Sequence, residues 1–439
     1  MDAAPFLSTL SDFATAGQDM YALMRKLYPI CRSITGDGVR QTLRILQQHI
    51  PLQIHEVPSG TPVFDWTVPR EWNIRDAYVK DSRGNKVIDF QQSSLHVLNY
   101  SVPVRAQMGL SELKEHLHSI PDRPHAIPYR TSYYREAWGF CIAHAQLNKL
   151  PEDTYEVVID SSLQDGHLTY GELVLPGAVD EEVLISCHCC HPSLCNDNLS
   201  GLMLSTWLAK TLSQQGQRRY TYRFLFIPGT IGSITWLATH TEAARKIKHG
   251  LVVACVGDAG HFTYKQSRRG DAEIDRTVAH ILKQSGQPHE IVAFSPYGYD
   301  ERQYCSPGFN LAVGSLSRTP HGAFPEYHTS DDNLDFVHAD CLAESLQRYH
   351  QVFDVLERNR TYRNLNPFGE PQLGKRGLYS ALGGHKDTKA REMAMLWVLN
   401  FSDGAHSLLD IAEHAGLPFS LVADVADALV AANLLAPVA

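Results

Sequence analysis

Histidine and aspartate residues stand in three polar clusters, each of which follows a run of apolar residues. His188 ends the run VLISCH, and Asp197 lies in an Asn-Asp-Asn triplet just ahead of an apolar helical pattern. Asp258 follows the run LVVACVG, and His328 lies in the polar cluster at 326–332. Imidazole nitrogens and carboxylate oxygens are the ligands of hydrolytic zinc sites, which leave one position open for water. We therefore take these four residues as candidate metal ligands.

Each of these residues taken alone also has a purely structural explanation. A histidine at a strand end is more often a hydrogen-bonded residue than a ligand, and an aspartate ahead of a helix is more often an N-cap. In open α/β sheets, however, functional sites lie outside the carboxyl ends of the strands. Because the three clusters follow successive strand patterns, we expect them to meet at one edge of a sheet, which favours a shared metal site.

Strand and helix patterns alternate between Thr154 and about Asn359. The apolar run at 183–189 is typical of a strand that is covered on both faces. Such alternation predicts a mostly parallel, doubly wound sheet with helices on both faces. Residues 63–134 consist instead of short β-branched and aromatic runs broken by Pro, Asn, Asp and Gly, which predicts a β-rich block.

The C-terminal part of the chain has its own character. A Gly- and Pro-rich stretch at 367–384 predicts a linker or an extended arm, and three helical patterns follow it. The last two are joined through Gly416 and Pro418, which is helix-turn-helix spacing. After Arg391, however, the sequence contains no Lys or Arg, whereas a DNA-recognition helix needs bases that neutralise phosphate. We expect this module to pack on a neighbour or to form a homodimer.

Composition excludes several classes of protein. The 439-residue chain has a net charge of −9, without the basic stripes of a nucleic-acid or membrane binder. The N-terminal residues show no signal-peptide pattern, and no stretch approaches the roughly 20 apolar residues of a membrane helix. Nine cysteines form no recognisable disulfide framework. We expect a cytoplasmic protein with no nucleic-acid and no membrane partner.

Several longer motifs carry a resemblance to a known family. They are the block from His188 to Gly201 with its Asn-Asp-Asn-Leu-Ser-Gly ending, the later Asp after a strand, and Tyr-His-Thr-Ser at 327–330. These resemble the zinc aminopeptidases with a phosphorylase/hydrolase-like fold. YPICRSITGDGVR, VFDWTVPREWNIRDAY and PEYHTSDDNLDF more closely resemble a bacterial group of aminopeptidase-like proteins, and the resemblance covers nearly the whole chain.

The resemblance implies a fold class and a domain organisation. The fold would be α/β, a zinc-aminopeptidase-like doubly wound α/β/α sandwich with an inserted β-rich domain and a C-terminal winged helix-turn-helix domain. Residues 1–62 and 151–365 would form the α/β domain, 63–150 the insert, and 375–439 the winged helix.

The resemblance also implies roles for the candidate ligands. His188 and Asp258 would bind one zinc, His328 would face a second metal position, and Asp197 would bridge the two. The implied activity is hydrolysis of an amide next to a free amine in a small peptide or aminoacyl substrate, with a metal-bound water as nucleophile.

Two departures from the family pattern bear on the number of zinc ions. Family members carry an Asp two residues after the first His, where this chain has Cys190. They also carry a Glu-Glu pair, base and ligand, after the next strand, where this chain has Gly229 and Thr230. We therefore expect one zinc rather than two, bound either without His191 or with His191 as an additional ligand.

With the Glu-Glu pair absent, the base and the substrate contacts must come from elsewhere. A general base must be a carboxylate or a His within reach of the reacting water, and Glu301 and Glu326 are the candidates. Both could equally form loop salt bridges. The substrate-binding candidates, from the same loop regions, are Arg302, Arg318, Tyr304 and His321.

Three functions remain open on the sequence. The first is a metal-dependent aminopeptidase or amide hydrolase. The second is a peptidase-fold binding or scaffold protein that has lost catalysis, which the missing Glu-Glu pair motivates. The third and weakest is a transcriptional regulator, motivated only by the C-terminal helices.

Overall fold

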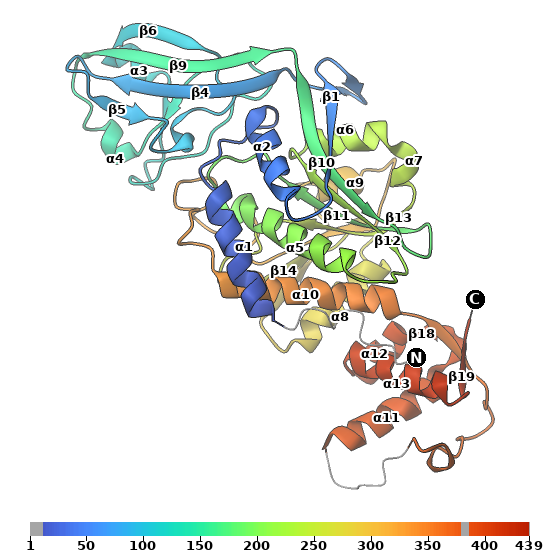
Figure 1. Cartoon of the computed structure of the whole chain (residues 1–439). Helices are drawn as coiled ribbons and strands as arrows, with labels where there is room; N and C mark the ends of the chain where they lie inside the picture. The colour runs from blue at the N-terminus through green and yellow to red at the C-terminus, as the bar shows by residue number, and fades with distance from the viewer. Residues whose placement is uncertain (1–11, 379–385, 439) are drawn as a thin grey trace. The chain divides into compact units, whose positions relative to one another are not determined.

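The computed structural model describes residues 12–378 and 386–438 and divides into two compact units. The larger unit comprises Asp12–Ala272 and His289–Gln347, and the smaller one includes Glu273–Pro288 and Arg348–Ala439. Figure 1 shows the course of the chain. Residues 379–384 of the expected linker lie outside the described residues.

An eight-stranded mixed sheet forms the centre of the larger unit, in the order β1-β10-β12-β11-β13-β16-β14-β15. Its four central strands, β12, β11, β13 and β16, are parallel to one another. They come from the apolar runs seen in the sequence, because strands covered on both faces can carry apolar residues throughout. The outer strands add antiparallel pairs, so the sheet is less uniformly parallel than predicted. The strands are β1 (Gln53–Pro58), β10 (His167–Leu175), β11 (Glu182–His188), β12 (Thr221–Ile227), β13 (Ile247–Val253), β14 (Phe262–Lys265), β15 (His289–Val292) and β16 (Val313–Ser317).

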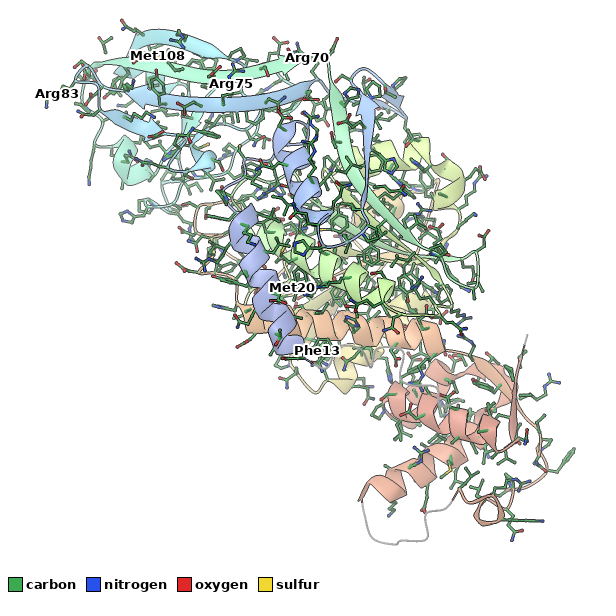
Figure 2. All side chains as sticks on the ribbon, viewed as in Figure 1. Phe13, Met20, Arg70, Arg75, Arg83 and Met108 are labelled. Atoms are coloured by element: carbon green, nitrogen blue, oxygen red, sulfur yellow. The ribbon has the colours of Figure 1, made fainter. Side chains whose placement is uncertain are left out.

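Helices cover this sheet. α1, α2 and α5 lie together on one side of it in Figure 1, and α5 contacts the central strands. Figure 2 shows Phe13 and Met20 along α1, whose N-cap Asp12 accepts the backbone N–H of Thr15 at 3.1 Å. The helices of this unit are α1 (Phe13–Leu27), α2 (Asp37–Leu46), α5 (Gly201–Ser213), α6 (Ile231–Thr239), α7 (Thr241–Ala244) and α9 (Glu301–Tyr304).

A second, four-stranded antiparallel sheet has the order β5-β4-β9-β6. Its longest strand, β9, comes after the expected insert boundary at residue 150, so this sheet extends to Gln164. Trp72 and Tyr155 of this sheet share one apolar core with Leu225 of the large sheet. Arg75 and Met108 lie on it in Figure 2. The elements of this region are β2 (Pro62–Val63), β3 (Trp66–Thr67), β4 (Glu71–Lys80), β5 (Lys86–Asp89), β6 (Val104–Gly109), α3 (Leu110–Lys114), β7 (Leu117–His118), β8 (Phe140–Cys141), α4 (His144–Leu147) and β9 (Thr154–Gln164).

The smaller unit has its own core. The predicted helix-turn-helix is present, because Gly416 takes the left-handed conformation (φ 66°) that ends one helix before the next begins at Phe419. Ser407 and Asp410 form a capping box at the start of α12. The elements are α8 (Glu273–Gln284), β17 (Thr361–Asn364), α11 (Lys386–Phe401), β18 (Asp403–Ser407), α12 (Leu408–Ala415), α13 (Phe419–Ala431) and β19 (Leu435–Pro437), with α10 (Ala339–Arg358) reaching into both units.

Among the residues that the structure describes, every helix is too short or too polar to span a bilayer.

Candidate metal centre

Imidazole groups surround the carboxylate of Asp197 at the carboxyl end of β11. His188, the last residue of that strand, has its Nε2 2.8 Å from Asp197 Oδ1. His328 Nε2 lies 3.0 Å from the other oxygen, Oδ2, and His191 Nδ1 lies 3.8 Å from that same atom. Asp197 therefore presents both of its oxygens to imidazole nitrogens, at the edge of the sheet where the sequence predicted convergence.

His191 provides the test of whether this group suits a cation. Its Nδ1 is shielded from solvent and has no hydrogen-bond partner among the described residues. Burial lowers the pKa of His191 well below its ordinary value, so its nitrogen lone pair is available. One ligand atom each from His188, His191 and Asp197 lie within 4.8 Å of one another. Two imidazoles and a carboxylate fit zinc, and a bound cation would satisfy the unpaired nitrogen.

Asp197 itself is fully buried and ionised. Burial alone would raise the pKa of its carboxyl, but its interactions with His191 and His188 hold that pKa well below the ordinary value. A permanently ionised carboxylate between imidazoles is the charge arrangement that a divalent cation requires.

Buried polar side chains fix the loop between β11 and α5. Asn198 donates to the backbone oxygens of His188 at 3.2 Å and Val253 at 3.0 Å, and its own oxygen accepts the N–H of Gly201. Asp332 accepts the N–H groups of residues on the same loop. The sequence did not single out Asp332, because such an Asp side chain is indistinguishable from a helix cap before the fold is known.

Asp258 does not join the imidazoles. Its Oδ1 accepts the N–H of Gly260 at 2.7 Å and the hydroxyl of Thr319 at 2.5 Å. Its Oδ2 accepts the amide of Asn196 at 2.9 Å and the N–H of Thr319 at 3.3 Å. With both oxygens engaged by protein donors, Asp258 orients the loop that carries Asp197, in contrast to the ligand role expected for it.

His328 is held by the region around the small sheet. Its backbone oxygen accepts the N–H of Tyr129 at 2.7 Å. The Tyr129 ring meets both His328 and His191 edge-on, with centroids 5.0 and 5.1 Å apart. On its other side, Tyr327 stacks on the His328 ring at 3.9 Å. Tyr129 could not be predicted as a neighbour of the site, since nothing near it in the sequence marks a site residue.

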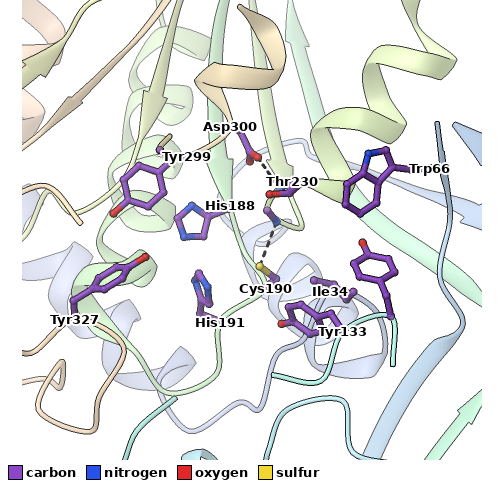
Figure 3. A pocket seen from close by; sticks show the side chains of 13 residues that line it. Ile34, Trp66, Tyr133, His188, Cys190, His191, Thr230, Tyr299, Asp300 and Tyr327 are labelled. Carbon is purple, nitrogen blue, oxygen red and sulfur yellow. Dashed lines mark hydrogen bonds between the residues drawn. The ribbon is translucent and has the colours of Figure 1, made fainter. Parts of the chain in front are cut away.

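A cavity of about 260 Å³ opens onto this group. In Figure 3, His188 and His191 lie between Tyr299 and Tyr327 on one side and Trp66 on the other. Tyr299 stacks on His188 at 5.4 Å. The cavity is lined by Ile34, Trp66, Tyr133, Tyr134, His188, Cys190, His191, Gly229, Thr230, Gly298, Tyr299, Asp300 and Tyr327.

Gly229 and Thr230, at the position of the expected Glu-Glu pair, line this cavity without providing a carboxylate. A Cβ at Gly229 would lie 3.6 Å from both His188 Cβ and Cys190 Sγ, so a side chain there would face the candidate ligands. Asp300 provides the only carboxylate among the cavity-lining residues that the structure describes. Its Oδ1 accepts the N–H of Thr230 at 2.6 Å, as Figure 3 shows. Burial raises the pKa of Asp300.

The two predicted bases lie elsewhere. Glu301 is fully buried, and its Oε1 accepts a hydrogen bond from Lys265 at 2.8 Å. Glu326 lies 3.9 Å from Arg123 in a partly exposed salt bridge. Neither of the two lines the cavity. The carboxylate that lines the cavity belongs to Asp300, the residue immediately before Glu301.

Of the four predicted substrate-binding residues, two lie next to residues that line the cavity and two do not. Arg302 donates to the cavity residue Thr230 at 3.4 Å and lies just behind the lining. His321 contacts the ring of Tyr299 at 4.8 Å. Tyr304 is buried against Ser186, and Arg318 pairs with Glu344 at 3.0 Å, so these two are structural.

Fold and site together place this chain in the zinc-aminopeptidase-like class of α/β proteins with a C-terminal winged helix. The chain belongs to the DUF4910 family, described as a domain of unknown function, whose model matches residues 21–359. A winged helix-turn-helix model matches residues 360–437. A relative from Clostridium acetobutylicum is 54% identical over 426 residues, which are 97% of this chain and 98% of the relative. It is provisionally named a polysaccharide biosynthesis protein with an aminopeptidase-like domain.

Solved structures agree on the fold. A crystal structure of a provisionally named peptidase from Clostridium acetobutylicum is 53% identical, has a TM-score of 0.93 and covers 98% of each chain. A zinc aminopeptidase from Bacillus subtilis has a TM-score of 0.55 at 10% identity, covering 77% of this chain and 94% of its own. A peptidase M28 precursor from Shewanella amazonensis has a TM-score of 0.53 at 14% identity, covering 80% of this chain and 96% of its own. The predicted fold class is thus confirmed.

Proposed function

We propose that this protein is a metal-dependent hydrolase that cleaves an amide next to a free amine in a small substrate. The observation that carries the proposal is the convergence of His188, His191 and His328 on Asp197 beside a cavity that His188 and His191 line, with one imidazole nitrogen left unpaired. The aminopeptidase-like name of the 54% identical relative supports the same class of reaction.

The residues that would hold zinc are His188, His191 and Asp197, with His328 on the outer oxygen of Asp197. When bound there, zinc would supply the Lewis-acid chemistry of amide hydrolysis. The imidazoles are fixed by aromatic neighbours, Tyr299 against His188 and Tyr327 against His328, so little reorganisation accompanies binding.

Asp300 is the group that we propose accepts and returns a proton. It lines the cavity, and its Oδ1 is held by the N–H of Thr230 and by the hydroxyl of Ser233 at 3.0 Å. Burial raises the pKa of its carboxyl toward the range in which a proton can be both taken up and released.

Tyrosine hydroxyls complete the lining. Burial raises the pKa of Tyr133 and Tyr299 well above the ordinary value, so both stay protonated and can donate hydrogen bonds. A donor aimed at a developing negative oxygen stabilises it more strongly in a desolvated cavity than in water. We propose that one of these hydroxyls serves the substrate carbonyl.

Two observations bear on the substrate. A cavity of about 260 Å³ lies below the range of roughly 300–1,000 Å³ for small-molecule sites, which suits a group the size of an amino-acid residue. The relative's name associates that protein with polysaccharide biosynthesis. We therefore propose a saccharide-linked amide, such as an aminoacyl amino sugar, as the substrate class.

Metal analysis of the purified full-length protein, combined with turnover, tests the proposal. We expect zinc to copurify, and we expect loss of amide hydrolysis on chelation and its return on addition of zinc. His191→Ala should lower both metal content and turnover, whereas His125→Ala, at an exposed position, should change neither. A protein that hydrolyses a panel of aminoacyl amides equally well with and without chelator would exclude this function.

A binding or scaffold role is the second candidate, favoured by the absence of a carboxylate at Gly229 and Thr230. In that case the protein would bind zinc and the aminoacyl compound, but it would show no turnover under any metal condition. Metal content and turnover measured on the same preparation therefore separate the two functions.

We propose that the winged helix contacts protein rather than DNA. Asp424 and Asp427 on α13, the second helix of the motif, pair with Arg358, the former at 2.6 Å, and this helix carries no Lys or Arg. A homodimer formed through this module should appear as twice the chain mass in light scattering. Binding of duplex DNA at physiological salt would contradict the assignment.

A further inference from the structure

Two aromatic side chains at the mouth of the cavity remain in contact with solvent. Trp66 is 40% exposed and Tyr134 is 51% exposed, and both also line the cavity. Their ring centroids are 5.3 Å apart with an interplanar angle of 66°, so the rings form an open corner. We call these two residues the aromatic corner. Such exposure of large apolar rings marks an interaction surface more often than a folding requirement.

The backbone that presents these rings is in an unfavourable conformation. Tyr134 has φ 65°, and Phe64, which precedes Trp66 in the β2–β3 hairpin and is 60% exposed, has φ 56°. Bulky residues rarely adopt the left-handed region, at a cost of about 1–3 kcal/mol each. Strain and apolar exposure thus coincide in the two segments that form the corner. A ligand that uses the rings accounts for both.

Polar groups surround the corner. Arg70 follows the β2–β3 hairpin, Glu136 follows Tyr134, and their side chains form a partly exposed ion pair that ties the two segments together. Asp65 between Phe64 and Trp66 is exposed as well. The site therefore offers ring faces bordered by charged groups in open solvent, rather than an enclosed apolar pocket.

We propose that Trp66 and Tyr134 form a stacking platform for a sugar ring of the substrate, at the mouth of the cavity that receives the amide. This inference rests on the proposed function and adds the subsite for the leaving portion. A pyranose has an apolar C–H face, which stacks on an aromatic ring, and hydroxyls at its edge, which bind charged groups. A substrate with an apolar side chain would instead bind best where the protein encloses that side chain and excludes water from it. The open corner does not enclose a side chain in this way.

Kinetics with matched substrates test the platform. Glycyl-glucosamine, with glycine amide-linked to the sugar nitrogen, is compared with glycinamide, which has no ring, on the zinc-loaded full-length protein. We expect Trp66→Ala and Tyr134→Ala to raise KM for glycyl-glucosamine by about tenfold, with kcat unchanged and glycinamide unaffected. Trp66→Phe should retain most of the affinity. Phe368→Ala, at a remote ring that is 99% exposed, is the matched control.

Two results would overturn the platform. One is an equal effect of Trp66→Ala on glycyl-glucosamine and glycinamide. The other is glycyl-leucine binding as well as glycyl-glucosamine with the same dependence on Trp66, which would make the corner a site for apolar side chains.

Saturation-transfer NMR with N,N′-diacetylchitobiose separates this inference from the proposed function, because it requires no turnover. Saccharide binding that depends on Trp66, in a protein that hydrolyses no amide, would support the platform and reject the hydrolase. Hydrolysis of glycinamide without saccharide binding would support the hydrolase and reject the platform.

Discussion

The carboxylate of Asp332 accepts the backbone N–H of Asp197 at 2.9 Å. The same carboxylate accepts the N–H of Asn196 at 2.6 Å, and the backbone oxygen of Asp332 accepts the N–H of Cys195. The loop that carries the central carboxylate is therefore held by a second carboxylate from the segment that carries His328. Because both Asp332 and Asp197 are buried, this arrangement fixes the distance between the two ligand-bearing segments.

Replacing Asp332 with Asn should loosen this loop. The amide can accept with one oxygen only, and its NH2 group would face a backbone donor, which costs about 1–3 kcal/mol for a buried mismatch. We expect zinc affinity to fall by about 10- to 100-fold, as for other groups that support metal ligands. The neighbouring Asp331, whose salt bridge to Arg123 is partly exposed, provides the control, since Asp331→Asn should leave zinc affinity unchanged. Equal affinities of the two variants would show that Asp332 plays no part in positioning the site.

The adjacent residues Asp300 and Glu301 should respond differently to neutralisation. Asp300→Asn retains an oxygen for the N–H of Thr230 but removes the proton acceptor from the cavity, so kcat should fall by about 10²- to 10⁴-fold with zinc content unchanged. Glu301→Gln retains an acceptor for Lys265 and should keep kcat within a few-fold of the unmodified protein. The reverse ranking in steady-state assays would restore Glu301 as the base.

The close approach of α5 to β13 makes Gly201 sensitive to substitution. A Cβ there would lie 2.5 Å from the backbone oxygen of Val253 and would also meet the Asn198 side chain. Gly201→Ala should therefore lower the free energy of unfolding by about 1–3 kcal/mol. Gly229→Ala, whose Cβ would make only ordinary contacts, should lie within about 0.5 kcal/mol of the parent. Urea denaturation measures both, and a stable Gly201→Ala protein would contradict the packing described.

Stability should fall on acidification because of buried histidine. Burial lowers the pKa of His350 from 6.5 to about 4. Between those values the unfolded chain binds the proton more readily, so the stabilisation present above pH 6.5 is lost as pH falls toward 4, by up to about 3 kcal/mol. His350→Leu should show a smaller loss of unfolding free energy between pH 7 and pH 4.5 than the parent, as measured in urea. Exposed His125→Leu should keep the parental slope, and an identical slope for His350→Leu would contradict the assignment.

Much of the fold was predictable because the central strands are buried on both faces. The strands β11, β12, β13 and β16 lie in runs rich in apolar residues and are almost wholly buried, and helical patterns follow them. The edge strand β15 could not be predicted, for the opposite reason. β15 is only four residues long and largely exposed, so it carries no apolar signature. β9 lies within the range expected for the α/β domain but pairs with β4 and β6, because the sequence pattern of a strand does not indicate its partner.

The candidate site was predictable to the extent that strand ends define it. His188, Asp197 and His328 lie together because they follow neighbouring strands or join the loops at that edge. Spacing cannot show which carboxylate turns toward a cavity. The sequence therefore does not reveal that both oxygens of Asp258 bind protein donors, or that Asp300 rather than its neighbour Glu301 lines the cavity. Contributions from the region around the small sheet, such as Tyr129, depend on contacts between distant segments.

The hydrogen bond between the backbones of Tyr129 and His328 connects two distant segments of the chain at the candidate site. The same two segments are joined again between Ile127 and Ser330. Ser330 donates its N–H to the backbone oxygen of Ile127 at 2.8 Å, and Ile127 donates its own N–H to the Ser330 hydroxyl at 3.0 Å. Trimming the chain to its large sheet would sever these bonds and leave the His328 segment without its anchor. Because Tyr133 and Tyr134, a few residues after Tyr129, line the cavity, a displacement of this segment would move a wall of the cavity and the His328 segment together.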